Sequence, residues 1–133
     1  MVMNKTLTKK QMNECLTAQQ GEMDAVYMYE KLAKRVKDDA DKKAFARLAR
    51  DEARHADVFR KYTNKELKPK IAKGIFVPLV YQVLGKKKVY PMIAKGEYDA
   101  ADKYKHIIAD FPEVETVMHD EVRHGDAVMG LLK

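Results

Sequence analysis

The chain has 133 residues, 46% of them hydrophobic, a formal net charge of +6 and one cysteine, Cys15. Its length suits a single domain over residues 1–133, and one cysteine excludes both an internal disulfide and a Cys/His zinc site, which favours the reducing cytoplasm. The lysine-rich runs behind the positive charge come without a nucleic-acid motif, so we interpret them as solvated surface and expect no nucleic-acid partner.

Two long helices are predicted in the first half of the chain. Residues 8–11 have the spacing of a capping box, and helix-forming residues continue without proline to about Lys37. The Asp38–Asp39 pair can cap a second helix that runs to about Tyr62, before the stop signal of residues 63–69. Since only a short turn separates the two helices, they should form an antiparallel hairpin.

Residues 70–85 connect the two halves of the chain. Gly74 and Pro78 disfavour a full bundle helix there, so we expect a connection with a short helix in its second half. The longest apolar run, residues 75–84, also lies here and is about half of the roughly 20 residues that a membrane helix needs. Because residues 1–10 also lack the features of a signal segment, we expect no membrane partner.

Two further long helices are predicted in the second half. The third should cover about Lys87 to Ala109, and the DFPE sequence of residues 110–113 offers a D-x-x-E start for a fourth helix that reaches about Leu132. The expected fold is therefore all-α. It is a four-helix bundle of two helical hairpins, joined by a long crossover connection that contains a short helix.

A repeated motif lies in the second and fourth helices. The sequence DEARHAD at residues 51–57 returns as DEVRHGD at residues 120–126. In both helices the apolar positions follow steps of three and four residues, and these steps pass through the Glu and the His of the motif, so both should be buried. Burying an unpaired carboxylate costs of order several kcal/mol, so these groups must be protonated, paired or bound to a cation.

The repeat extends to the first and third helices. GEMDAVYMY at residues 21–29 aligns with GEYDAADKY at residues 96–104, which puts Glu22 and Glu97 in matching positions. The chain thus consists of two related helical hairpins.

The spacing of the glutamates predicts their heights in the bundle. Glu22 and Glu52 lie about equally far from the turn between the first two helices, and Glu97 and Glu121 stand in the same relation to the turn between the last two. Both helices of an antiparallel hairpin rise about 1.5 Å per residue, so such residues lie level with each other. If the hairpins pack with approximate two-fold symmetry, four carboxylates and two imidazoles meet in one layer.

Six such side chains suit two first-row transition-metal ions. One Glu from each of two helices, with Glu-x-x-His from each of the other two, is the ligand set of di-iron and di-manganese carboxylate bundles. Carboxylates can bridge two cations, and imidazole nitrogens favour iron or manganese over calcium or magnesium. The alternative is a set of helix-surface residues or local ion pairs, which leaves the two buried copies and the matched heights unexplained.

From about Gln11 to Leu132 the chain resembles the ferritin-like superfamily, above all the erythrin domain of rubrerythrins, and it is also similar to bacterioferritins. This resemblance implies a centre of two iron ions, with manganese or a mixed iron and manganese pair as alternatives. Glu52 and Glu121 would bridge the ions. The metal-ligating and catalytic residues that the resemblance implies are Glu22, Glu52, His55, Glu97, Glu121 and His124.

Two departures from rubrerythrins bear on the reaction. The position three residues after Glu97, where rubrerythrins often carry a further Glu, is Ala100, which puts their redox-linked ligand exchange in question. No rubredoxin-like CxxC module follows the helices either. Electrons would have to come from a separate donor protein such as a rubredoxin.

Two tyrosines are candidates for a supporting role. Tyr29 and Tyr104 lie seven residues after Glu22 and Glu97, two turns along the same helix face. In relatives a tyrosine near this place hydrogen-bonds a ligand carboxylate or passes an electron. A core tyrosine with a satisfied hydroxyl is the alternative.

Two aspartates precede the glutamates that would bridge the ions. Metal-bound histidine usually donates its other N–H group to a carboxylate. By similarity to bacterioferritins, Asp51 could serve His124 and Asp120 could serve His55. Aspartates on the helix surface are the alternative.

The implied function is that of a di-iron oxidoreductase that oxidises its di-iron(II) centre with hydrogen peroxide or dioxygen. Peroxide reduction as in rubrerythrins is our first expectation. Ferroxidase activity as in bacterioferritins and a non-catalytic iron carrier are the alternatives. Residues 63–86 are long enough to span a bundle, and relatives exchange a hairpin through such a linker, so we expect a homodimer, with domain swapping as an option.

Overall fold

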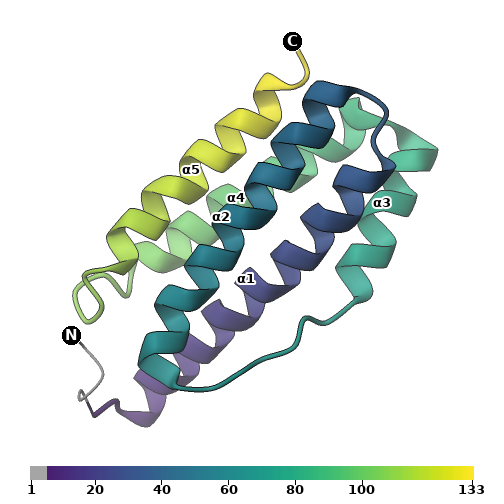
Figure 1. The fold of residues 1–133 in the computed structure, drawn as a ribbon. Coiled ribbons are helices and arrows are strands. Elements are labelled where there is room, and N and C mark those ends of the chain that lie inside the picture. Colours follow the sequence, from purple (N-terminus) through teal and green to yellow (C-terminus); the bar gives the residue numbers. More distant parts are fainter. Residues whose placement is uncertain (1–5) are drawn as a thin grey trace.

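The computed structural model describes residues 6–133, and this part of the chain is built from helices without a strand (Figure 1). The expected all-α class is confirmed. No helix of the described part is long and apolar enough to cross a membrane. The expectation about a signal segment in residues 1–10 falls partly on residues 1–5, outside the described residues. The helices are α1 (Lys9–Arg35), α2 (Asp39–Thr63), α3 (Ala72–Leu84), α4 (Lys86–Lys105) and α5 (Val114–Gly130).

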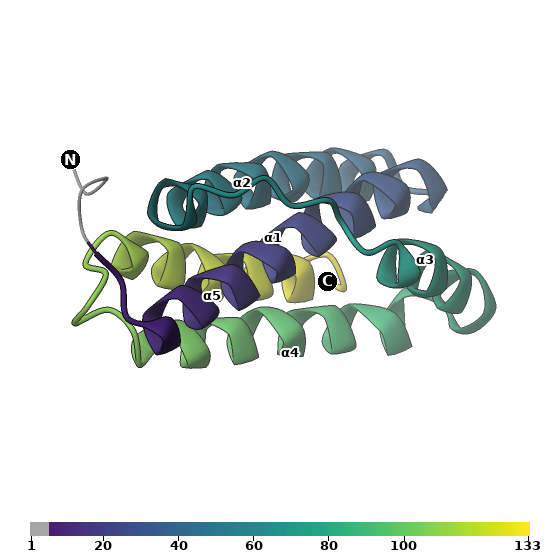
Figure 2. The ribbon, with the colours of Figure 1, turned by 90° about the horizontal axis from the view of Figure 1, so that it is seen from below.

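The four long helices form the expected bundle of two hairpins. α1 packs against α2, α4 packs against α5, and the hairpins meet where α2 contacts α5. The connection after α2 runs back along α1 to α3, which lies beside one end of the bundle and contacts both α1 and α4 (Figures 1 and 2). Along their described lengths α1 and α4 make no backbone contact, so this side of the bundle stays open.

The helix ends follow the sequence signals only in part. The capping box at the start of α1 is present, since Thr8 and Gln11 exchange hydrogen bonds between side chain and backbone. The D-x-x-E start expected for the last helix is wrong, because α5 begins at Val114 and Glu113 precedes it without a side-chain cap. The preceding helix, α4, ends at Lys105 rather than near residue 109. Turns fill the interval because the fully buried Phe111 side chain packs on the ring of Tyr62, with centroids 4.6 Å apart.

The helix in the crossover is longer than expected. We predicted a short helix in the second half of residues 70–85, whereas α3 spans Ala72–Leu84 and contains both Gly74 and Pro78. Gly74 lies against Tyr27 of α1, where an added Cβ would sit 2.1 Å from the tyrosine ring. Packing on α1 therefore stabilises helical geometry that the local sequence disfavours, and the glycine permits the close approach.

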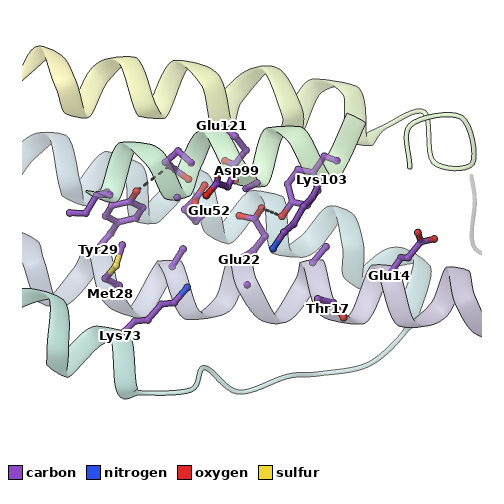
Figure 3. Close-up of a pocket in the computed structure, with 18 of the residues that line it drawn as sticks. Glu14, Thr17, Glu22, Met28, Tyr29, Glu52, Lys73, Asp99, Lys103 and Glu121 are labelled. Atoms are coloured by element: carbon purple, nitrogen blue, oxygen red, sulfur yellow. Dashed lines mark hydrogen bonds between the residues drawn. The ribbon is translucent and has the colours of Figure 1, made fainter. Parts of the chain in front are cut away.

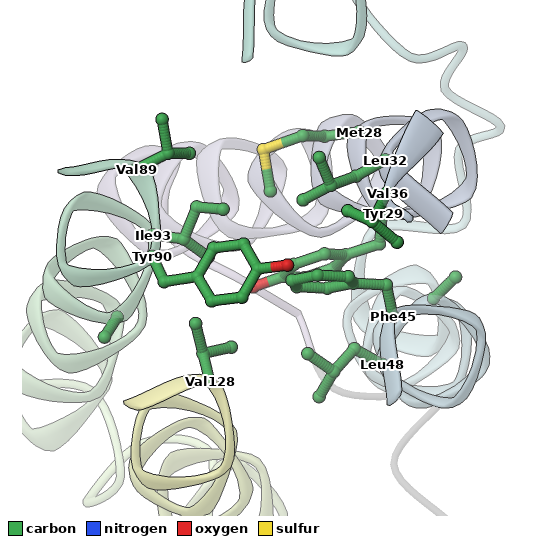
Figure 4. Packing of buried hydrophobic residues seen from close by; sticks show 12 residues of the cluster. Met28, Tyr29, Leu32, Val36, Phe45, Leu48, Val89, Tyr90, Ile93 and Val128 are labelled. Carbon is green, nitrogen blue, oxygen red and sulfur yellow. The ribbon is translucent and has the colours of Figure 1, made fainter. Parts of the chain in front are cut away.

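Two hydrophobic clusters fill the bundle on either side of a polar layer. In the first, Tyr29 stacks on Phe45 with ring centroids 5.8 Å apart, and the edge of Tyr90 meets Phe45 at 5.2 Å (Figure 4). The second cluster contains Phe59 and Tyr104, whose centroids are 5.2 Å apart. The clusters hold all four long helices at fixed heights, so the residues between them are fixed as well.

The buried Asp41 ties the start of α2 to α4. The Tyr90 hydroxyl donates a hydrogen bond to Asp41 Oδ2 at 2.7 Å, and Lys86 Nζ lies 3.4 Å from the same oxygen. Lys86 also donates to the carbonyl of Leu131 at 3.2 Å. The contacts of Asp41 with Tyr90 and Lys86 link the two hairpins at the end of the bundle away from the α4–α5 turn.

Replacing Asp41 should therefore destabilise the fold. In Asp41→Ala the buried Tyr90 hydroxyl loses its acceptor, and we expect the free energy of unfolding in urea to fall by about 1–3 kcal/mol. The exposed Asp39 also lies in the first turn of α2, so Asp39→Ala is a matched control that should change this free energy by about 0.3–1 kcal/mol. An equal loss of unfolding free energy in the two variants would contradict a stabilising contact between Asp41 and α4.

Candidate metal centre

The six predicted ligand residues come together in the layer between the hydrophobic clusters. Each of the four long helices contributes at least one of them, and none is more than 6% exposed. They form two groups of four in which the potential ligand atoms lie within 4.8 Å of one another. Glu52 and Glu121 belong to both groups, as expected of bridging carboxylates. The first group adds Glu22 and His55, and the second adds Glu97 and His124.

Each imidazole points one nitrogen at three carboxylates. His55 Nδ1 lies 3.0 Å from Glu52, 3.2 Å from Glu121 and 3.5 Å from a third carboxylate, that of Glu22. His124 Nδ1 lies 3.1 Å from Glu97, 3.2 Å from Glu52 and 3.3 Å from Glu121. The two rings are nearly parallel, with centroids 5.5 Å apart. Two nitrogen and oxygen clusters therefore lie side by side.

The second nitrogen of each imidazole pairs with an aspartate of the other hairpin. His55 Nε2 is 2.8 Å from Asp120, and His124 Nε2 is 2.9 Å from Asp51. Both aspartates also pair with the arginine three residues later on their own helix. These contacts orient each ring so that its Nδ1 faces the glutamates, which is how metal-binding histidines are commonly held.

The two tyrosines also reach across the hairpins. The Tyr104 hydroxyl of α4 donates to Glu22 of α1 at 2.6 Å, and the Tyr29 hydroxyl of α1 donates to Glu97 of α4 at 3.1 Å. The resemblance offered a tyrosine hydrogen bond to a ligand carboxylate as one of two alternatives, and both tyrosines make such a bond. We did not predict that each tyrosine would bond to the glutamate of the other hairpin, because helical spacing places a residue on a helix face but does not show which helix lies opposite.

The donor set fits bound cations better than a closed hydrogen-bond network. Four buried atoms have no hydrogen-bond partner within the described residues, although each lies among opposite charges. They belong to four of the six ligand residues and face the interior of the layer. Unpaired buried polar atoms are rare in folded proteins unless an ion or a water satisfies them. These atoms are Glu22 Oε1, Glu52 Oε1, Glu121 Oε1 and His55 Nδ1.

Mutual contact shifts the pKa values of the layer in opposite directions. Burial lowers the pKa of His55, but three facing carboxylates, Glu121 first, outweigh it and raise that pKa to about 12. The pKa of His124 is raised to about 12 for the same reasons. Burial raises the pKa of Glu121, yet the two imidazoles lower it to about 2. Without metal, imidazolium charges thus offset the carboxylates.

Glu22 and Glu97, which each belong to only one of the two groups and which we call the outer glutamates, have raised pKa values. Burial, and then the charge of Glu52, raise the pKa of Glu22 well above its ordinary value. Burial also raises the pKa of Glu97 to about 8, although the hydrogen bond with His124 opposes the shift. Both carboxyl groups lie beside the open side of the bundle, and a bound cation would favour their charged forms.

A cavity of about 1310 Å³ between α1 and α4 leads to the layer (Figure 3). Its lining includes four of the six predicted ligand residues and both Tyr29 and Tyr104, but neither His55 nor His124. Gly21 and Gly96, which precede the outer glutamates in both repeats, line it too, and an added Cβ at either would meet no atom within 4 Å. The repeated glycine was the sequence signal for this opening, and sequence reasoning missed it.

Comparison with known families agrees with this geometry. A family model described as Rubrerythrin matches residues 16–117, which is more than half of the chain. The chain therefore belongs to the rubrerythrin family, whose domain is a ferritin-like helical bundle, and the resemblance inferred from the sequence is confirmed. No curated protein and no solved structure matched in two further comparisons. Family and geometry together indicate a carboxylate-type di-iron site.

The shared glutamates should decide metal binding. Wild type is expected to bind two Mn(II) ions per chain in equilibrium dialysis, and Glu52→Ala with Glu121→Ala should bind few or none, because both groups of ligands lose two members. Glu66→Ala with Glu115→Ala removes two exposed carboxylates and should leave the stoichiometry unchanged. Two ions retained without Glu52 and Glu121 would refute the bridging assignment.

The metal-free protein should become less stable as pH rises. A group whose pKa is raised by folding stabilises the fold at low pH, and this contribution is lost between its ordinary and its folded pKa. For Glu97 the loss runs from pH 4.5 to about 8, and for His55 and His124 from pH 6.5 to about 12. Thermal melting from pH 5 to about 9 should therefore show a falling Tm.

Two comparisons isolate the source of this pH dependence. Gln does not titrate, so metal-free Glu97→Gln should lose less stability than wild type between pH 4.5 and about 8. Added Mn(II) should stabilise wild type more at high pH than at low pH, because the ligands must release protons to bind it. A Tm that rises with pH in the metal-free protein would contradict the assigned shifts.

Proposed function

We propose that this protein is a di-iron oxidoreductase that reduces hydrogen peroxide to water with electrons from a separate donor protein such as a rubredoxin. The observation that supports this proposal is the pair of overlapping ligand groups, buried together and reached by one cavity. Two iron ions held by these residues would supply one electron each, which matches the two-electron reduction of peroxide. The single cysteine favours a cytoplasmic setting for this chemistry.

The protein's own residues define which parts of the site are rigid. Asp120 and Asp51 hold the two imidazoles from behind, so the nitrogen ligands are fixed in tautomer and direction. Glu22 and Glu97 face the cavity, and each accepts one tyrosine hydrogen bond. Because the carboxylates border this open space and the imidazoles do not, we expect them to be the ligands that shift as the charge of the centre changes.

The cavity is large enough to admit a small oxidant such as hydrogen peroxide or dioxygen. Much of its lining consists of small or apolar side chains, including Ala18, Ala25 and Ile93, and the glycines widen it beside the outer glutamates. Hydrogen peroxide is small and uncharged, so it can enter such a passage without a desolvation penalty for charge. Ala100 also lines the cavity, so no further carboxylate competes with Glu97 for the metal at that position.

The same centre could serve iron oxidation by dioxygen or plain iron carriage, and one experiment separates these functions. Protein loaded with Fe(II) without oxygen would be mixed with hydrogen peroxide or with dioxygen while near-ultraviolet absorption is recorded. We expect fast oxidation by peroxide, slower oxidation by dioxygen, and repeated cycles when a reductant is added. Stable binding without oxidation would indicate a carrier, and faster reaction with dioxygen a ferroxidase.

The aspartate behind His124 should matter for the rate. In Asp51→Ala the imidazole loses its partner, and we expect the peroxide-driven oxidation or the metal affinity to fall about 10–100-fold. Asp57→Ala is a matched control, because Asp57 pairs with Arg60 three residues on as Asp51 pairs with Arg54, but Asp57 is exposed and touches no ligand residue. Equal rates together with equal metal affinities in the two variants would refute the role of Asp51.

A further inference from the structure

The outward face of α3 is apolar. Ile75, Phe76, Leu79 and Val83 lie on this face, between 48% and 74% exposed. The opposite face carries the buried Gly74 and Pro78 and packs on the bundle. In a helix on the surface of a soluble bundle the exposed face is normally polar, whereas α3 is apolar on its exposed face as well as on the face that packs against the bundle. Large exposed apolar patches mark places where another surface binds.

The apolar surface extends beyond α3. Ile71 precedes the helix, Leu84 ends it, and Met92 of α4 is 63% exposed. Phe76 and Met92 also line the mouth of the cavity between α1 and α4. The exposed surface is thus continuous with the passage to the candidate metal centre. We call the residues Ile71, Ile75, Phe76, Leu79, Val83, Leu84 and Met92 the α3 surface.

Lysines are the only charged residues in the segment that carries the α3 surface. Residues 67–96 contain seven Lys and neither Asp nor Glu. Lys86 pairs with Asp38 and Lys95 pairs with Asp99. The other five lysines are exposed, and within the described residues none has a carboxylate at salt-bridge distance. These are Lys68, Lys70, Lys73, Lys87 and Lys88.

We propose that the α3 surface is a docking site for a membrane that carries anionic lipid headgroups. An interfacial helix buries its apolar face at the boundary of headgroups and acyl chains, while lysines beside it contact the phosphates. The α3 surface offers both parts. A contact of this kind needs no spanning helix, so it revises the expectation of no membrane partner, which rested on the lack of spanning and signal segments.

A second copy of the chain fits this surface less well. In a symmetric dimer with α3 on the two-fold axis, the α3 surface would face its own copy, so the lysines of one chain would meet those of the other. Residues 67–96 contain no carboxylate to pair with them, and like charges brought together repel. Anionic headgroups provide the complementary charge.

Vesicle sedimentation tests the proposal directly and does not depend on bound metal. Full-length protein would be mixed with vesicles of phosphatidylcholine alone, or of phosphatidylcholine with phosphatidylglycerol, at low and high salt. We expect binding to the anionic vesicles, with an affinity that falls as salt rises. Phe76→Ser with Leu79→Ser should weaken binding at least about tenfold, because two apolar side chains are lost from the contact.

Matched variants control for general effects of substitution. Val122→Ser with Met129→Ser replaces two exposed apolar residues of α5 and should bind like wild type. Lys87→Glu with Lys88→Glu should weaken binding at least about tenfold, whereas Lys42→Glu with Lys43→Glu on α2 should weaken it less. All variants change exposed side chains, and circular dichroism would verify that they fold.

Three results would overturn the proposal. The first is the absence of binding to anionic vesicles at low salt. The second is wild-type binding by Phe76→Ser with Leu79→Ser. The third is a dimer in sedimentation velocity that this variant converts to monomer while vesicles bind no protein, which would assign the α3 surface to a contact between copies.

Discussion

The burial of four carboxylates and two imidazoles in one layer is the constraint on which the rest of the structure depends. Such a layer is stable only if charge is balanced locally, since unpaired buried charge costs several kcal/mol. Each imidazole Nδ1 faces three carboxylates, and the pKa values of Glu22 and Glu97 are raised, so two protonated rings and two protonated carboxyl groups provide the balance without metal. Cations among the same atoms would provide it with metal. The site is therefore pre-assembled by the charges that the metals would later neutralise.

Hydrogen bonds between the two hairpins set the geometry of this layer. Every supporting hydrogen bond to a ligand residue comes from the other hairpin. Neither hairpin alone could orient its own ligands, so assembly of the bundle and assembly of the site are one event. The four pairs are Tyr29 with Glu97, Tyr104 with Glu22, Asp120 with His55, and Asp51 with His124.

The sequence predicted the positions of side chains correctly where they depend on helix periodicity and on the number of residues from a turn. The Glu-x-x-His motifs and their matched heights follow from helix rise and turn position, and the structure brings those side chains together. It failed where tertiary contacts override local preference. Packing on Tyr27 keeps α3 helical through Gly74 and Pro78, and burial of Phe111 shortens α4. The cavity was also missed, because Gly21 and Gly96 were interpreted only as part of the internal repeat.

The internal repeat makes the site symmetric, but the crossover makes its surroundings asymmetric. α2 and α5 meet directly and carry the histidines and their aspartates, so that side is closed and rigid. α1 and α4 are held apart, and the outer glutamates and tyrosines face the cavity between them. Since α3 lies at the end of this opening, any molecule that enters beside Phe76 and Met92 reaches the carboxylates first. The two histidines thus form the back of the candidate centre, and the carboxylates that line the cavity form its front.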